Sequence, residues 1–296
     1  MIRLFSLISL VLTVALAHAQ VDAEKLMGEF EAALKDPKAV PYGHNKETGK
    51  YFSGRGFKMY YEVYGSGEPL LIIHGNGGSI NNFIYQIPYF AQHYKVIIAD
   101  NRAQGRSHDY SNDSLTYEMM ADDYAALLDS LKIDSAYVIG WSDGGINGLL
   151  LALRHPEKVK KMALVGANLQ PDTTAVPQEV WDLVRPSYEA LAAKPTLNAI
   201  EKSSFKLLRL LCTQPHIDPA SLGQIKAPAL IIGGDHDVIR EEHTLLIYKS
   251  LPRAYLWIVP GSGHSVPILY KDEFNKTVER FFKTPYKTIS GQGRFM

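Results

Sequence analysis

Residues 137–145 read Tyr-Val-Ile-Gly-Trp-Ser-Asp-Gly-Gly, a short apolar run that passes through Gly-x-Ser-x-Gly into a helical pattern. A serine between a buried strand and a helix, with glycine two positions to either side, is typical of a nucleophile elbow. Larger side chains at those two positions would collide with the turn, which holds the serine in a strained backbone conformation. The stretch therefore predicts that Ser142 is presented at the carboxyl edge of a sheet, beside the amides of a helix N-terminus.

Short apolar runs rich in valine, isoleucine and leucine recur on both sides of this stretch, with helical patterns between them. Continuous apolar runs are typical of parallel strands buried on both faces, and their alternation with helices predicts an α/β sheet covered on both sides. Alternating aromatic and polar residues between Tyr51 and Leu71 predict hairpin strands ahead of this sheet. The apolar runs are Leu70–Ile73, Val96–Ala99, Tyr137–Ile139, Met162–Val165, Leu230–Ile232 and Leu256–Val259.

The strand pattern stops over residues 170–225, where six prolines punctuate helical stretches. We interpret this segment as a small helical cap inserted into the sheet domain. No internal repeat or low-complexity linker divides the remainder. The sequence thus predicts one domain over residues 20–296, with the cap at about 170–225.

Residues 1–19 read MIRLFSLISLVLTVALAHA, in which Arg3 precedes an apolar run that ends at the small-x-small triplet Ala17-His18-Ala19. This pattern predicts a signal peptide cleaved near Ala19. The run is too short for a membrane span, so we expect an exported protein, periplasmic or secreted, without a stable membrane anchor. The single cysteine, Cys212, suits an oxidising compartment because it has no partner with which to form a disulfide.

Composition excludes several functional classes. The chain has 31 Lys+Arg against 31 Asp+Glu, and this neutral balance predicts no binding to nucleic acid. One cysteine cannot build a cysteine zinc cluster, and His236 and His243 lack a third ligand at suitable spacing, so no metal site is predicted. Cys212 has no motif of a catalytic thiol around it.

A glycine-rich turn follows the run Leu70–Ile73, where residues 74–78 read His-Gly-Asn-Gly-Gly. Backbone amides in such a turn can point at a ligand oxygen, as an oxyanion hole requires. We expect the amides of Asn76 and of Asp143, the residue after Ser142, to be the donors. Neither of the two common phosphate-binding glycine motifs fits these residues, and His74 is expected to shape the turn rather than to act in catalysis.

Acidic residues and a histidine follow two later strand runs. Residues 233–237 read Gly-Gly-Asp-His-Asp, and residues 260–264 read Pro-Gly-Ser-Gly-His. Both segments are expected at the same edge of the sheet as Ser142, because the carboxyl ends of parallel strands share an edge. The order of serine, then an acid, then His264 is a catalytic triad order, with Asp235 and Asp237 both available as the acid.

With these motifs in order, the chain resembles the α/β-hydrolase superfamily over its mature length, on segments 74–78, 100–102, 140–145, 234–237 and 261–264. The resemblance implies a mostly parallel eight-stranded sheet flanked by helices, with a small helical cap. It also implies Asp237 as the triad acid, because the family's acid lies three residues after the glycine that ends the strand. Asp100 and Arg102 depart from the family's usual glycine-rich continuation, and we expect them to be structural.

The implied function is that of a serine hydrolase acting on a small carboxylic ester or related acyl bond. Ser142 would attack the acyl carbonyl, His264 would accept its proton, Asp237 would orient the imidazole, and water would release the acyl group without any cofactor. The serine argues against relatives with an aspartate nucleophile. The partner is a small-molecule acyl substrate, and the sequence does not define an oligomeric state.

Two alternatives remain open at this stage. The elbow, together with Val165-Gly166-Ala167-Asn168, resembles the valacyclovirase-like branch of the superfamily, and this implies an aminoacyl-ester or peptidase-type hydrolase whose Asp143 carboxylate binds the substrate amine. Otherwise that carboxylate would hydrogen-bond the elbow backbone. Trp141 would either line the acyl pocket as a substrate-binding residue or lie buried beneath the elbow. The non-enzyme alternative is a small-molecule binding protein on the same fold.

Overall fold

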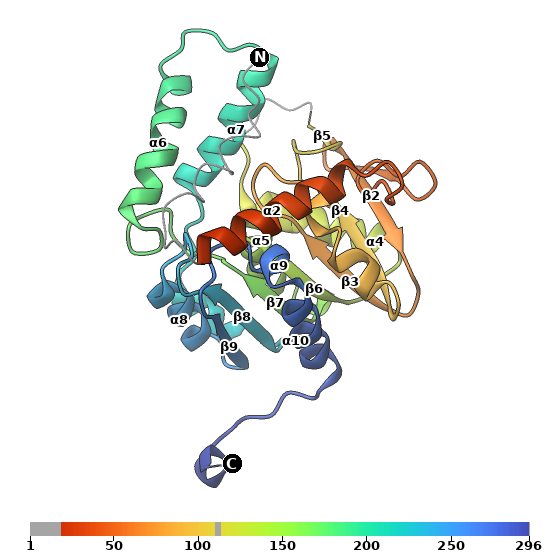
Figure 1. The fold of residues 1–296 in the computed structure, drawn as a ribbon, viewed down its shortest axis with the longest axis vertical. Coiled ribbons are helices and arrows are strands. Elements are labelled where there is room, and N and C mark those ends of the chain that lie inside the picture. The colour runs from red at the N-terminus through yellow and green to blue at the C-terminus, as the bar shows by residue number, and fades with distance from the viewer. Residues whose placement is uncertain (1–18, 110–113, 296) are drawn as a thin grey trace.

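The computed structural model describes residues 19–109 and 114–295. Their centre is a twisted, mostly parallel sheet in the order β1-β2-β4-β3-β6-β7-β8-β9, with the two-residue β5 pairing with β2 (Figure 1). β1 and β2 form the expected antiparallel hairpin, and from β4 to β9 neighbouring strands are parallel. The strands are β1 (Lys50–Gly54), β2 (Phe57–Tyr64), β3 (Glu68–Ile73), β4 (Tyr94–Ala99), β5 (His108–Asp109), β6 (Ala136–Trp141), β7 (Val159–Val165), β8 (Ala229–Gly234) and β9 (Ala254–Val259).

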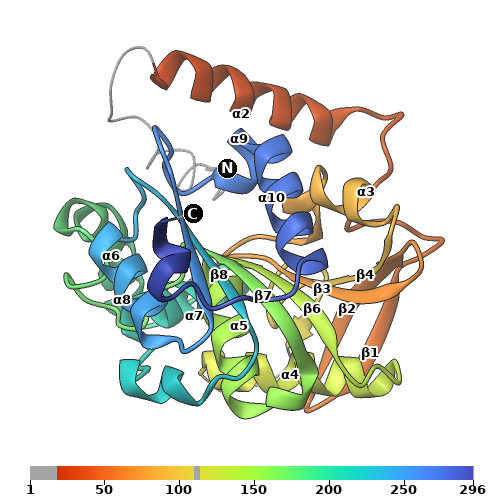
Figure 2. The same ribbon diagram turned by 90° about the horizontal axis from the view of Figure 1, so that it is seen from below.

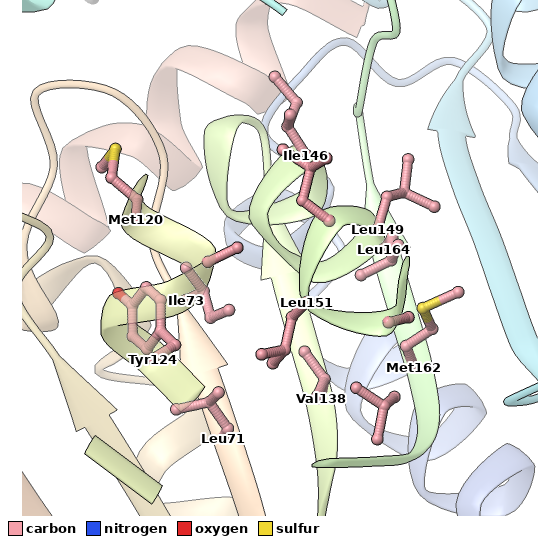
Figure 3. Packing of buried hydrophobic residues seen from close by; sticks show 14 of the residues in the cluster. Leu71, Ile73, Met120, Tyr124, Val138, Ile146, Leu149, Leu151, Met162 and Leu164 are labelled. Carbon is pink, nitrogen blue, oxygen red and sulfur yellow. The ribbon is translucent and has the colours of Figure 1, made fainter. Parts of the chain in front are cut away.

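The central parallel strands are buried on both faces, as their continuous apolar runs predict. Along β3, Leu71 and Ile73 belong to one core cluster and Leu70 and Ile72 to another, because successive side chains of a strand point to opposite faces. Figure 3 shows the first cluster, in which strand residues pack against α4 (Tyr117–Ser130) and α5 (Asp143–Arg154). The second cluster lies under α3 (Gln86–Phe90) and α10 (Lys271–Lys283).

Most remaining helices follow a strand and return the chain to the next one. α8 (Glu241–Ser250) connects β8 to β9, and the short α9 (Val266–Leu269) begins just after the His264 loop. Single 3-10 turns lie at η1 (Ile80–Phe83), η2 (Pro156–Lys158), η3 (Pro219–Gln224) and η4 (Gly291–Phe295). This placement brings the loops after β3, β6, β8 and β9 to one edge of the sheet.

The segment interpreted as a cap contains two helices, α6 (Gln178–Ala192) and α7 (Ala199–Thr213), which lie side by side and extend away from the sheet (Figure 1). Tyr188 and Phe205 stack between them with ring centroids 5.6 Å apart. At their base, Trp181 is buried with Val176 and Ile239. α7 also packs on the body through Leu210, which is buried in the first core cluster, while much of the surface of both helices is exposed.

The N-terminal helix α2 (Ala19–Lys35) lies across α9 (Figure 2), where Phe30 is buried and contacts the ring of Tyr85. Except for Ala19, the predicted signal segment 1–19 lies outside the described residues. Within the described ranges, no helix has the length and apolar character needed to cross a membrane.

Asp100 and Arg102 have structural contacts on the loop after β4. The Asp100 carboxylate accepts hydrogen bonds from the backbone amides of Ile80 and Arg106, at 2.8 and 2.7 Å. Arg102 forms a bidentate salt bridge with the buried Asp123, with both N···O distances 2.8 Å. These contacts fix the loop beside the glycine-rich turn.

Candidate active site

Ser142 lies in the strained turn that the Gly-x-Ser-x-Gly pattern predicts. It has φ 59° and ψ −122° immediately before α5, a backbone conformation that residues other than glycine rarely adopt. A Cβ on Gly140 would lie 2.2 Å from the carbonyl oxygen of Gly144, and one on Gly144 would lie 2.1 Å from that of Ile73. The two glycines are therefore required by close backbone approach.

Asp237 and His264 form a close pair in the loops after β8 and β9. The His264 Nδ1 lies 2.6 Å from Asp237 Oδ1, and the Asp237 carboxylate is fully buried whereas the His264 side chain is 20% exposed. Asp237 also accepts from the amide of Ile239 at 3.1 Å, which fixes the carboxylate. The bond holds Nδ1 as the donor and leaves Nε2 of a neutral imidazole as the proton acceptor.

Asp235, the other acid open from spacing alone, does not contact His264. Its carboxylate accepts from the backbone amides of Gly261 at 2.9 Å and Ser262 at 3.0 Å, and Oδ1 lies 2.9 Å from His236 Nδ1. It therefore anchors the loop that carries His264. The structure brings Asp237, and not Asp235, to the imidazole.

Trp141 ties the His264 loop to the elbow. Its indole Nε1 donates to the His264 carbonyl at 2.8 Å, and the two rings lie 6.0 Å apart. The Ser142 amide donates to the carbonyl of Val165 at 2.8 Å, and a Cβ on Gly166, the next residue, would lie 2.6 Å from the His264 ring. Among the described residues, Ser142 Oγ and His264 form no direct hydrogen bond.

His74 shapes the glycine-rich turn and is fully buried. Its Nδ1 donates to the carbonyl of Gly75 at 2.7 Å, and its Nε2 accepts from the amide of Asn101 at 2.8 Å. Burial lowers the pKa of His74 to about 4, so the ring is neutral at pH 7 with one donor and one acceptor. These contacts agree with the structural role expected for this histidine.

Two backbone amides lie near Ser142, one in the glycine-rich turn 74–78 and one at the start of α5. A Cβ on Gly75 would lie 2.9 Å from Ser142 Cβ, so the turn lies directly against the nucleophile. Asp143, as the first residue of α5, has an amide without an intrahelical acceptor. The Asn76 amide donates to no acceptor within the described ranges. Both amides expected as oxyanion donors are therefore available.

Asp143 is almost completely buried, with 1% of its surface exposed. Its Oδ2 accepts from Asn76 Nδ2 at 2.9 Å, so the carboxylate bonds a side chain and not the elbow backbone. Burial raises the pKa of Asp143 to about 6, against the lowering effects of Asn76, Tyr117 and His264. The Tyr117 hydroxyl lies close enough to the Asp143 carboxylate to interact with its charge, but it forms no hydrogen bond of ordinary geometry.

The pKa of His264 depends on its two acidic neighbours. Burial alone lowers this pKa, but the charge and hydrogen bond of Asp237, together with the charge of Asp143, outweigh burial and raise it above 6.5. The imidazole is thereby a stronger base than an isolated histidine, which suits proton abstraction from a hydroxyl.

Three residues near the site were not predicted from the sequence motifs. Gly166, with φ 58°, lies against both His264 and Asp237, and entered only through a family resemblance. Gln104 accepts from the Gly77 amide at 2.7 Å, and Tyr117 lies next to Asp143. No local motif marks these positions, because their roles depend on contacts between distant segments.

Other reactive side chains do not extend the site. No group of three or more potential metal ligands occurs in the described part of the chain. His243 is buried and accepts from the amide of Leu169 at 2.9 Å, while His236 bonds Asp235. Burial raises the pKa of Cys212 to about 11, so its thiol is protonated at neutral pH.

Residues 68–205 match the family model described as alpha/beta hydrolase fold. The chain has the α/β-hydrolase fold of that family. This hydrolase is 25% identical to human serine hydrolase BPHL over 277 residues, which cover 87% of the chain and 95% of the relative. It is 26% identical to a 2-hydroxy-6-oxononadienedioate/2-hydroxy-6-oxononatrienedioate hydrolase of Burkholderia vietnamiensis, over 80% of the chain and 96% of the relative.

A solved structure described as Est816, an N-acyl homoserine lactone degrading enzyme, matches with a TM-score of 0.67. The two sequences are 25% identical, and the match covers 78% of this chain and all of that one. These relatives are hydrolases, and the matches cover most of their length. The chain is therefore an enzyme of the α/β-hydrolase type. The fold expected from the sequence is confirmed.

Proposed function

We propose that the enzyme is a serine hydrolase that cleaves a small carboxylic ester, or a related acyl bond, through an acyl-enzyme on Ser142. The observation that carries this proposal is the buried Asp237–His264 pair, whose 2.6 Å bond leaves Nε2 available next to the strained serine turn. An aspartate–histidine pair beside a serine is the arrangement that activates a hydroxyl for acyl transfer.

Each residue then has one step in the reaction. Ser142 Oγ attacks the acyl carbonyl while His264 Nε2 accepts its proton, and the imidazolium is stabilised by the Asp237 carboxylate. The Asn76 and Asp143 amides donate to the oxyanion, each contributing about 3–4 kcal/mol. The imidazolium protonates the leaving alcohol, and water, deprotonated by the same nitrogen, then hydrolyses the acyl-enzyme.

Covalent labelling tests the nucleophile directly. We expect a fluorophosphonate to modify the purified protein once, on the peptide that contains Ser142, as read by mass spectrometry. An inert serine would support the alternative of a small-molecule binding protein. A panel of esters, thioesters, lactones and aminoacyl amides then identifies the acyl bond that is cleaved fastest.

The acid limb of the activity profile is expected to have a midpoint above pH 6.5. His264 must be neutral to accept the proton, and its pKa is raised by Asp237 and Asp143, so kcat/KM falls as the pH drops through that raised value. Asp143→Asn removes one of the two negative charges, and its acid limb should move to lower pH. A limb that stays in place would show that Asp143 does not act on the imidazole.

An aminoacyl-ester substrate is the second candidate, and the environment of Asp143 supports it. The carboxylate is buried beside the nucleophile, and none of the ion pairs among the described residues includes it. A substrate α-ammonium would supply the missing positive charge at this position. On this hypothesis Asp143 has a substrate-binding role, and Trp141 acts by positioning the His264 loop.

Asp143→Ala tests amine recognition through a ratio of two activities. We expect kcat/KM for an aminoacyl ester to fall about tenfold or more beyond the fall for the acetyl ester of the same alcohol. The acetyl ester is the internal control for damage to the oxyanion hole. Equal losses on both esters would reject amine recognition and leave the simple ester hydrolase.

We also propose that the enzyme acts outside the cytoplasm, in the periplasm or the medium. The proposal rests on the pattern of residues 1–19, where one cation, an apolar run and a small-x-small triplet follow in order. N-terminal sequencing of the protein from the expressing cell's periplasm or medium would locate the cleavage, which is expected after Ala19.

A further inference from the structure

One side chain connects three parts of the site that are far apart in the sequence. Asn76 Nδ2 donates to Asp143 Oδ2 at 2.9 Å and to the carbonyl oxygen of Leu207 at 3.3 Å. Asp143 begins α5, whereas Leu207 lies in the middle of the cap helix α7. The amide thus joins the glycine-rich turn both to the elbow and to the cap.

The two residues joined by the shorter bond are those whose backbone amides are the proposed oxyanion donors. In such a hole the donors must be held within a fraction of an ångström of the position of the oxyanion. The Asn76–Asp143 bond links the two donor residues directly through their side chains. The other contacts of the turn, His74 with Gly75 and Gly77 with Gln104, hold the positions on either side of Asn76.

The longer bond makes the same residue sensitive to the cap. Leu210 of α7 is buried in the first core cluster, and α7 passes over the turn at Leu207. A displacement of α7 away from the body would break this contact and release one of the two restraints on the Asn76 amide. Seating of α7 would restore it.

We propose that Asn76 is a positioning residue whose side-chain amide couples the cap helix α7 to the geometry of the oxyanion hole. This inference rests on the proposed function, because it concerns the same hole. It assigns to the Asn76 side chain a role separate from that of its backbone amide. The cap thereby contributes to the rate of acyl transfer.

Kinetics of Asn76→Ala with p-nitrophenyl acetate provide the first test. We expect kcat to fall 10- to 100-fold while KM changes less than threefold, because the backbone donor is kept but displaced. The rate of fluorophosphonate labelling should fall in parallel. A wild-type protein that neither labels nor turns over the ester would refute the proposed function, whereas an active wild type with an equally active Asn76→Ala would overturn only this inference.

A double-mutant comparison separates positioning from general damage. Asp143→Ala already removes the link between the donors and leaves the bond to Leu207, so adding Asn76→Ala should lower kcat by a smaller factor than Asn76→Ala does in the wild-type background. Losses that multiply in the double variant would contradict the coupling. Asn76→Asp, which keeps the size of the side chain but lacks the donor, is expected to lose at least as much as Asn76→Ala.

Hydrogen exchange tests the contact between Asn76 and the cap helix α7. Peptides covering residues 205–213 should exchange faster in Asn76→Ala than in wild type, whereas Asp143→Ala retains the bond to Leu207 and should exchange as wild type does. Asn198→Ala is the matched control, because Asn198 caps α7 through Glu201 and lies outside the site. The Tm of Asn198→Ala is expected to fall while its kcat stays within twofold of wild type, because the bond from Asn76 to Leu207 is kept. Exchange over residues 205–213 that is unchanged in Asn76→Ala would overturn the proposal.

Discussion

Replacement of Ser142 by alanine is expected to lower kcat for a chromogenic ester by about 10⁴-fold or more, the effect of losing a covalent nucleophile. The remaining groups could still bind the ester and stabilise an oxyanion, so a small residual rate above the uncatalysed reaction is expected. Alanine keeps the Cβ of the strained turn, so the melting temperature should change little. Steady-state kinetics and a thermal melt of the same preparation measure both quantities.

The control for this substitution is Ser203→Ala, which removes an exposed serine from α7. It should retain full turnover and full fluorophosphonate labelling, while Ser142→Ala loses both. Turnover within tenfold of wild type in Ser142→Ala would reject the acyl-enzyme mechanism. Loss of turnover accompanied by a collapsed melting transition would instead identify Ser142 as a structural requirement.

The fold could be predicted in detail because its signals are local. Each apolar run from Leu70–Ile73 to Leu256–Val259 lies within a parallel strand, since residues buried on both faces of a sheet must be apolar. The boundaries were less accurate: the run Tyr137–Ile139 lies within β6, which extends from Ala136 to Trp141. Glycine is required at 144, in the first turn of α5, because the backbone of Ile73 lies too close for a side chain.

The site was only partly predictable from the residues. Spacing places both Asp235 and Asp237 after β8, and the choice between them depends on a loop conformation in which one carboxylate faces the imidazole and the other faces backbone amides. The contact of Asn76 with Leu207 joins residues 131 positions apart. No pattern around either residue encodes it, because it depends on where the cap helix lies over the body.

Asp237→Asn is the second substitution with a large expected effect, a fall in kcat of about 10³- to 10⁴-fold. The amide that replaces the carboxylate cannot stabilise an imidazolium, and its NH₂ group can turn toward Nδ1 and favour the wrong tautomer. The shape of the side chain is retained, but an NH₂ group at the Oδ1 position also removes the acceptor of the Ile239 amide, while the remaining oxygen still faces the Gly234 amide. The loss should therefore lie in kcat, with KM nearly unchanged.

Asp235→Asn provides the comparison that assigns the triad acid. This carboxylate accepts hydrogen bonds from two backbone amides of the His264 loop, one on each oxygen. An asparagine at 235 keeps one of these two acceptors, so we expect a loss of less than about tenfold with some loss of stability. The ratio of the two losses is the decisive measurement, because both residues lie in one loop and carry the same change. If Asp235→Asn were the more damaging to kcat, the acid would have to reach His264 in a loop conformation different from the one seen, and the 2.6 Å bond of Asp237 would be structural.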